Sequence, residues 1–180
     1  MAFFIRPATD AEWEDAMALA WRVFSEFEAP FYGEQGTKSF LDFISGNTLK
    51  NVFLHGKYPV FLAIDEESGK IIGVISLREH NHISLLFVDS AYQKTGVGTA
   101  LIKRAGEYVR TDNEYARHDR NKPEEYRYFR EKGGILTVNA APTAVGFYKK
   151  NGFVVTGEEK ENDGIRYVPM FKKDKLFRLK

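Results

Sequence analysis

The chain has 180 residues, 43% of them hydrophobic, which is enough for one domain with a single sizeable core and too little for two ordinary domains. Its 26 Lys and Arg balance 25 Asp and Glu, so no overall positive charge favours binding to nucleic acid or to an anionic membrane. Cysteine is absent, which excludes disulfides, thiolate metal ligands and a cysteine nucleophile, and no apolar run approaches the roughly 20 residues of a membrane-spanning helix, so we expect a cytoplasmic protein without a metal site.

The chain begins with a pattern typical of a strand followed by a helix. Ala2–Arg6 is a short apolar segment that predicts the first strand. Apolar residues then recur at spacings of three and four, which places them on one face of a helix that ends near Phe27. Thr9 or Asp10 is the residue expected to cap its start.

A second helix and three strands are predicted next. The segment 29–33 contains Pro and Gly and is expected to break the chain before a shorter helix at Thr37–Gly46. Val60–Asp65 and Ile71–Arg78 flank a glycine-containing turn and predict a hairpin. His82–Val88 has the length and apolarity of a central strand, which we expect to be buried on both faces at its carboxyl end.

The second half of the chain alternates helices and strands around one polar segment. A helix is predicted at Thr95–Arg110, and residues 111–134 form a long polar segment, with a helix start at Pro123, that is interpreted as a solvated excursion, a lid or a dimer contact. The expected remainder is a strand at Gly134–Asn139, a helix at Thr143–Lys150, and strands at Phe153–Thr156 and Arg166–Phe171 around an acidic turn at 157–164. This order predicts a mixed α/β fold with a strand–helix–strand crossover.

The turn after the central strand has the composition of a phosphate-binding loop. It reads Gln93-x-x-Gly96-x-Gly98 and leads directly into a helix, whose first N–H groups lack partners inside the helix and favour an anion. A tight turn or close helix packing would also explain the two glycines. The sequence excludes two common nucleotide motifs, because no Gly-Lys-Ser/Thr follows and Leu101 stands where a dinucleotide fingerprint has its third glycine.

Two segments resemble the motifs of the GNAT superfamily of N-acyltransferases. Leu-Leu-Phe-Val-Asp-x-x-Tyr-Gln-Lys-Thr-Gly-Val-Gly-Thr-Ala, which ends at Ala100, is similar to that family's acetyl-CoA diphosphate motif. The stretch from Leu136 to Phe153, which ends in Phe-Tyr-Lys-Lys-Asn-Gly-Phe, is similar to its second motif. The resemblance implies a mixed, mostly antiparallel sheet of about seven strands with helices on both faces and with the fourth and fifth strands splayed. The long segment 111–134 departs from the family pattern.

The same resemblance implies which residues bind acetyl-CoA. Tyr148 matches the family's tyrosine that protonates the departing thiolate, and its alternative role is that of a packing aromatic beside Phe147. Asn139 matches a strand-end residue that binds the cofactor arm or a bridging water, and it also suits a turn. The full set of implied acetyl-CoA contacts is Leu86, Phe87, Val88, Gln93, Lys94, Thr95, Gly96, Val97, Gly98, Thr99, Asn139 and Tyr148.

The general base is less well defined by the sequence. Glu79 and His82, at the hairpin before the central strand, are the first candidates, with His80 beside them and Glu26 or Glu28 after the first helix. Many family members deprotonate the amine through water, and carboxylates and histidines at strand ends are often only solvated. The aromatic and acidic run 24–34 falls where the family builds its acceptor wall, although a core helix and a solvated loop would also explain it.

These observations predict an N-acetyltransferase that moves acetyl from acetyl-CoA to an amine by direct attack. The alternatives are an inactive CoA-binding sensor or regulatory module and a nucleotide-binding domain, the latter disfavoured by the missing lysine and glycine. The sequence leaves the acceptor open among small molecules and polypeptides, from polyamines, aminoglycosides, amino acids and arylamines to a protein amino terminus. Pairing through sheet edges or through residues 111–134 would give a homodimer.

Overall fold

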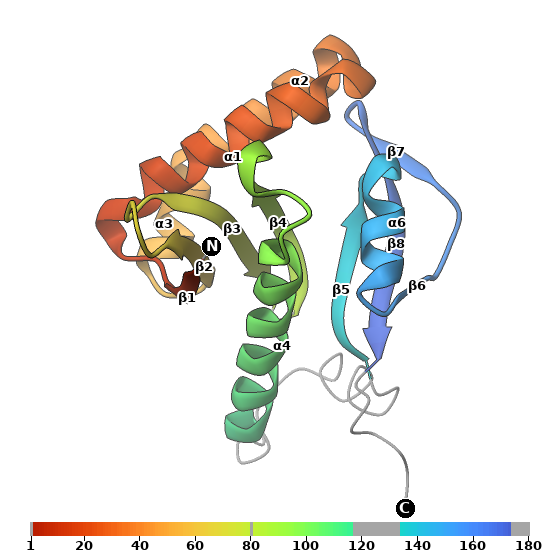
Figure 1. The fold of residues 1–180 in the computed structure, drawn as a ribbon. Helices are drawn as coiled ribbons and strands as arrows, with labels where there is room; N and C mark the ends of the chain where they lie inside the picture. Colours follow the sequence, from red (N-terminus) through yellow and green to blue (C-terminus); the bar gives the residue numbers. More distant parts are fainter. Residues whose placement is uncertain (1, 80, 117–133, 174–180) are drawn as a thin grey trace, which may run out of the picture.

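The computed structural model of the chain describes residues 2–79, 81–116 and 134–173 (Figure 1). The strands are β1 (Phe3–Pro7), β2 (Val60–Asp65), β3 (Ile71–Arg78), β4 (His82–Val88), β5 (Gly134–Ala140), β6 (Phe153–Val155), β7 (Lys160–Asn162) and β8 (Ile165–Lys173). The helices are α1 (Trp13–Phe27), α2 (Ala29–Ser45), α3 (Asn47–Leu54), α4 (Val97–Ala116) and α6 (Val145–Lys150), with short 3₁₀ turns at Asp10–Glu12, Ser90–Tyr92 and Pro142–Ala144. Over these ranges no helix is long and apolar enough to cross a membrane.

The eight strands of the described residues belong to one mixed sheet, as expected, and they are one more than the predicted seven. The order is β1-β2-β3-β4-β5-β8-β6, and β7 pairs with β8 outside this path. Neighbouring strands are antiparallel except β4 and β5, which are parallel and are connected through α4. Figure 1 shows α1, α2 and α3 on one face of the β1–β4 half of the sheet and α4 on the other.

Two apolar clusters hold these layers together, one on each face of the sheet. Alternate residues of β2 divide between them: Phe61 and Ala63 pack in the α4 cluster, whereas Leu62 and Ile64 pack under α1 and α3. A strand that is covered on both faces is buried along its whole length, which explains why β2 is apolar throughout instead of alternating with polar residues.

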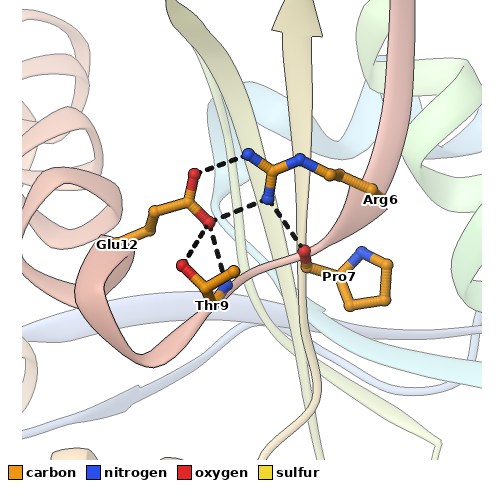
Figure 2. Close-up of polar contacts among 4 residues, drawn as sticks. All are labelled: Arg6, Pro7, Thr9 and Glu12. Atoms are coloured by element: carbon orange, nitrogen blue, oxygen red, sulfur yellow. Dashed lines mark hydrogen bonds and ion pairs between the residues drawn. The ribbon is translucent and has the colours of Figure 1, made fainter.

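A bidentate ion pair fixes the junction between β1 and α1 (Figure 2). The Arg6 guanidinium donates to both carboxylate oxygens of Glu12, at 2.6 and 2.8 Å. The same carboxylate accepts from the N–H and the hydroxyl of Thr9 at 2.8 and 2.9 Å, which completes a capping box at the helix start. Arg6 holds the pKa of Glu12 down at about 2, so this junction stays ionised and sets the direction in which α1 leaves the sheet.

The helical region after α1 differs from the prediction. Residues 29–32 are helical, because Pro30 lies in the first turn of α2, where its missing N–H costs no hydrogen bond. The break lies at Gly33, whose φ of 66° is accessible to glycine. The helix α3, between α2 and β2, was not predicted.

The remaining boundaries follow the prediction with smaller differences. The hairpin and β4 begin and end at the predicted residues, whereas α4 extends to Ala116 instead of ending at Arg110. The carboxyl end of β4 is only half-buried, because β5 does not accompany it there. The helix start predicted at Pro123 lies outside the described residues.

Candidate active site

The sheet opens between its two central strands. Parallel pairing of β4 with β5 is limited to His82 with Thr137 and Ile83 with Val138, and beyond these pairs the strands separate. The edge of β4 from Ser84 to Val88 therefore has no strand partner on its β5 side among the described residues. Main-chain groups left free in this way are available to an extended ligand that adds to the strand edge.

A cavity of about 440 Å³ occupies this opening and reaches both faces of the sheet. From the α1 and α2 side it is lined by Phe24, Glu28, Tyr32 and Phe40, and from the α4 and α6 side by Leu86 and Tyr148. One cavity therefore joins the two layers through the sheet.

Tyr148 lies on α6 with its ring packed between Phe147 and Phe153, at centroid distances of 5.3 and 5.1 Å. The residue is only 6% exposed and lines the cavity, and no described residue forms a hydrogen bond with its hydroxyl. Burial, together with the charge of Glu28, raises the pKa of the Tyr148 hydroxyl above its usual value, so the phenol keeps its proton at neutral pH.

Glu28 joins the end of α1 to the start of α2 and brings a carboxylate into the same cavity. The Thr143 hydroxyl donates to it at 3.3 Å, and it forms no ion pair among the described residues. Burial raises the pKa of Glu28, and the hydrogen bond from Thr143 offsets only part of that rise. Glu28 and Tyr148 therefore line the same cavity from opposite layers of the sheet.

The two first candidates for the base have different positions. His82 lines the cavity, and its Nδ1 lies 2.9 Å from the Thr137 hydroxyl. Burial and the nearby Arg78 lower the pKa of His82 to about 4, so its imidazole is neutral at pH 7. Glu79 occupies the β3–β4 turn with a φ of 49° and a side chain 77% exposed, and it is not part of the cavity wall. The structure thus brings His82 and Glu28 to the cavity but leaves Glu79 outside it.

The loop before α4 presents a run of free main-chain N–H groups. No hydrogen bond among the described residues uses the N–H groups of residues 94–99, and the first bonded amide is that of Ala100, which donates to Gly96 at 2.9 Å. Lys94 and Gly96 both have positive φ, 62° and 95°. Backbone that alternates in this way turns successive N–H groups toward one point and forms an anion-binding concavity.

The side chains of this segment divide between loop structure and surface. The Thr95 hydroxyl donates to the Tyr92 carbonyl at 2.5 Å and the Gln93 amide to the Val88 carbonyl at 3.3 Å, so both tie the loop to itself. The Val97 side chain is buried in the core, which leaves only its main chain for a ligand. Lys94 and Thr99 are exposed.

Gly98 connects the loop to Tyr148. A Cβ atom at Gly98 would lie 3.0 Å from the Phe147 ring, so the absence of a side chain lets α6 pack on the start of α4. By contrast, nothing lies within 4 Å of a Cβ at Gly96. The sequence offered ligand approach and close helix packing as reasons for these glycines; the packing explains Gly98, and the positive φ requires Gly96.

The other predicted cofactor residues lie along the opening. Leu86 and Phe87 line the cavity from β4, with Leu86 toward the α4 layer and Phe87 toward Phe40 of α2, at a ring distance of 5.5 Å. Val88 packs against the α4 cluster at the end of the free edge. Asn139 lines the cavity from β5, one residue beyond the last β4–β5 pair.

The helix α2 closes the α1 side of the opening by reaching across to the other half of the sheet (Figure 1). The Ser39 hydroxyl donates to the Asp163 carbonyl at 2.8 Å, and the Tyr32 hydroxyl to the Arg166 carbonyl at 3.0 Å. Asp163 lies in the turn between β7 and β8, and Arg166 lies at the start of β8. This contact between α2 and the β7–β8 hairpin was not predicted, because it joins residues more than 120 positions apart.

Comparison with known proteins identifies the architecture. The family model for the "Acetyltransferase (GNAT) domain" matches residues 28–119 and 124–174. This chain belongs to the GNAT acetyltransferase family. The predicted resemblance is therefore confirmed, and the chain is a GNAT-type acetyltransferase domain. A search of curated protein sequences found no match.

Solved structures share the fold at low sequence identity. A GCN5-related N-acetyltransferase from Rhodopseudomonas palustris superposes with a TM-score of 0.72 at 20% identity, over 96% of each chain. The PaiA N-acetyltransferase from Thermoplasma acidophilum, solved in complex with coenzyme A, gives 0.71 at 18% identity, over 97% of this chain and 100% of that one. YjaB from Escherichia coli gives 0.63 at 22% identity, over 95% and 97%.

Some residues of this GNAT site carried no signal in the sequence. Arg78, Ser84 and Arg166 line the cavity, yet each looks like an ordinary strand residue. Only the position of β3 and β4 beside the opening gives Arg78 and Ser84 access to it. No cluster of three or more His, Asp or Glu that could hold a metal ion occurs in the described ranges.

Proposed function

We propose that this chain transfers the acetyl group of acetyl-CoA to a primary amine by direct attack. The observation that carries the proposal is the cavity through the sheet, which joins Tyr148 and the free edge of β4 to the α1–α2 layer that holds Glu28. The donor would lie along the β4 edge with its diphosphate at the N–H groups of residues 94–99. The amine would enter from the side of α1 and α2.

In this proposal the neutral amine attacks the thioester carbonyl, a C–N bond forms and the C–S bond breaks. The departing sulfur takes the proton of the Tyr148 hydroxyl, and Tyr148 regains a proton from solvent. The amine nitrogen loses its proton to Glu28, directly or through water. The raised pKa of Glu28 supports this role, because a carboxylate whose pKa lies closer to the working pH is a stronger base.

His82 has a smaller part in the proposal. With a pKa of about 4 its imidazole is a weak base, although its neutral ring can accept a hydrogen bond from the amine. Leu86, Phe87, Val88 and Asn139 would contact the pantetheine arm, mainly through main-chain groups. The cytoplasmic location expected from the sequence is part of the same proposal.

The test is an assay of free-thiol release from acetyl-CoA against a panel of amines, with a no-amine control and mass analysis of the product. We expect thiol release that depends on the amine and yields one acetyl group on nitrogen. Binding of CoA by calorimetry without thiol release from any amine would contradict the proposal and favour the inactive CoA-binding module.

A further inference from the structure

A chain of three hydroxyl groups ends at the cavity wall. The Ser76 hydroxyl donates to the Tyr58 oxygen at 2.8 Å, and the Tyr58 hydroxyl donates to the Ser84 oxygen at 2.8 Å. Ser76 is 0% and Tyr58 2% exposed, whereas Ser84 is half-buried and lines the cavity. Apolar residues could fill this part of the core without any hydroxyl that needs a hydrogen-bond partner. Packing alone therefore does not explain why three hydroxyl groups are hydrogen-bonded in a row here.

The direction of the hydrogen bonds determines what Ser84 can do. Because Ser76 donates to Tyr58 and Tyr58 to Ser84, the Ser84 oxygen already accepts one hydrogen bond, and its own proton is left to donate elsewhere. Ser84 is also the first β4 residue after pairing with β5 ends, and it sits at a register irregularity between β3 and β4. It therefore presents a hydroxyl donor of fixed direction to the opening.

A guanidinium group that forms no hydrogen bond among the described residues, that of Arg78, lines the same cavity. Arg78 and Arg166 both line the cavity, but Arg166 is held by Glu159, with a contact of 2.6 Å from its Nε. The ion-pair partner of Arg78 is the exposed Glu79, at 3.7 Å, beyond hydrogen-bond distance. Arg78 pairs across the hairpin with His82, and Ser84 lies two residues further along the same strand, β4. Arg78 and Ser84 thus approach the same part of the cavity.

We propose that Arg78 and Ser84 form an oxyanion subsite, and that the acceptor is a molecule with a carboxylate as well as the reactive amine. The inference rests on the proposed function. A guanidinium and one hydroxyl supply donors that suit the two oxygens of a carboxylate, whereas a phosphate has more oxygens than this pair serves. Glu28 repels the carboxylate and attracts the ammonium group, so the two ends of the cavity orient the acceptor.

The experiment compares acceptors that differ only in the carboxylate: lysine with cadaverine, phenylalanine with phenethylamine, and 4-aminobutyrate with propylamine. We expect kcat/KM to favour the carboxylate-bearing member of at least one pair by about 10-fold or more. Arg78→Gln removes that preference, because it lowers kcat/KM for the carboxylate-bearing acceptor about 10- to 100-fold more than it lowers kcat/KM for its partner. Arg78→Lys retains part of the preference.

Further variants separate the subsite from the fold. Ser84→Ala and Tyr58→Phe both lower the preference, although Tyr58→Phe keeps the Ser84 hydroxyl, because Ser84 loses its fixed direction. Lys50→Gln, which removes a cation outside the cavity wall, leaves the preference unchanged. Because Tyr58 is buried, the stability of each variant is measured by thermal unfolding. If Tyr58→Phe does not fold, the variants of Arg78, whose side chain is 47% exposed, test the subsite on their own.

The outcomes distinguish this inference from the function on which it rests. Equal use of both members of every pair, or a preference that survives Arg78→Gln, would overturn the subsite and leave the acetyltransferase proposal intact. A greater preference for phosphoethanolamine than for any amino acid would overturn the choice of a carboxylate. Failure of every amine to release thiol would overturn the proposed function itself.

Discussion

The backbones of Gly36 and Gly164 lie in direct contact, so that a Cβ atom at Gly36 would stand 2.4 Å from the Gly164 carbonyl oxygen. Gly36 belongs to α2, which packs on one half of the splayed sheet, and Gly164 belongs to the β7–β8 turn of the other half. A contact this close excludes any side chain at Gly36. The two glycines therefore determine how closely α2 packs against the β7–β8 hairpin across the opening.

Replacement of Gly36 by Ala is expected to move α2 away from the β7–β8 hairpin. The added methyl group forces α2 and the hairpin apart, which costs about 1–3 kcal/mol of stability and raises KM for the amine more than KM for acetyl-CoA. Steady-state kinetics with each substrate varied, together with thermal unfolding, measure both effects. Gly146→Ala is the stability control, because nothing lies within 4 Å of its Cβ position in α6. Equal rises in both KM values would contradict a role specific to the acceptor side.

Removal of the Tyr148 hydroxyl is expected to slow the chemistry and spare donor binding. Tyr148→Phe keeps the ring that packs between Phe147 and Phe153, so the fold is retained, while the proton for the thiolate is lost. We expect kcat to fall about 100-fold or more, with the Kd of CoA unchanged by calorimetry. Tyr108→Phe, on α4 and outside the cavity wall, is the matched control. Wild-type turnover in Tyr148→Phe would remove the assigned role.

The pH dependence of turnover is expected to follow Glu28 and not His82. Burial raises the pKa of Glu28, so its carboxylate form is lost as pH falls through a value above the ordinary 4.5, and kcat/KM falls with it. His82, with a pKa of about 4, stays neutral throughout that range. Glu28→Gln should lower kcat/KM and abolish this acid limb, whereas His82→Gln should leave its position unchanged. An acid limb that moves in His82→Gln and persists in Glu28→Gln would reverse the two assignments.

The loop before α4 offers a test of donor binding with a matched control elsewhere in the chain. Gly96 has a φ of 95° and Gly69, in the β2–β3 turn, a φ of 69°, and a Cβ at either position meets nothing within 4 Å. Alanine at either position carries a similar backbone cost of about 1–2 kcal/mol. We expect KM for acetyl-CoA to rise about 10-fold in Gly96→Ala, because the N–H groups turn away from the diphosphate, and to stay unchanged in Gly69→Ala. Similar KM values in the two variants would place the diphosphate elsewhere.

The parts of the fold that sequence patterns predicted are those fixed by local chemistry. The β2–β3 hairpin and β4 have continuous apolar segments separated by turn residues, and their boundaries agree with the structure. Pro30 was interpreted as a helix breaker although it begins a helix, since proline suits both positions. The helix α3 was missed because Phe53 is its one buried residue, too little for a periodic pattern.

The active-site cavity depends on tertiary geometry that no local pattern contains. The end of pairing after Ile83 and Val138 is a property of two residues that lie 55 positions apart in the chain (138 − 83). Glu28 and Tyr148 line one cavity only because α1 packs on β3 and β4 while α6 packs on β6, across the open sheet. The phosphate loop was predictable because the N–H groups, the glycines and the helix start all lie within one short segment.

Acid unfolding should separate the two groups whose pKa values the fold lowers most clearly, His82 and Glu12. An unfolded His82 binds a proton near pH 6.5, whereas the folded one does so only near 4, so between these values the unfolded state binds more protons and stability falls as pH falls. This contribution reaches about 3 kcal/mol and levels off below pH 4. Glu12 loses its stabilising ionised form in a lower pH window, from about pH 4.5 down to 2.

Denaturant unfolding from pH 7 to 3 measures both contributions. In His82→Gln the free energy of unfolding should fall less steeply than in the wild type above pH 4.5, and in Glu12→Gln it should fall less steeply only below that value. A His82→Gln curve parallel to the wild type above pH 4.5 would mean that this imidazole is not held neutral by burial in the folded chain.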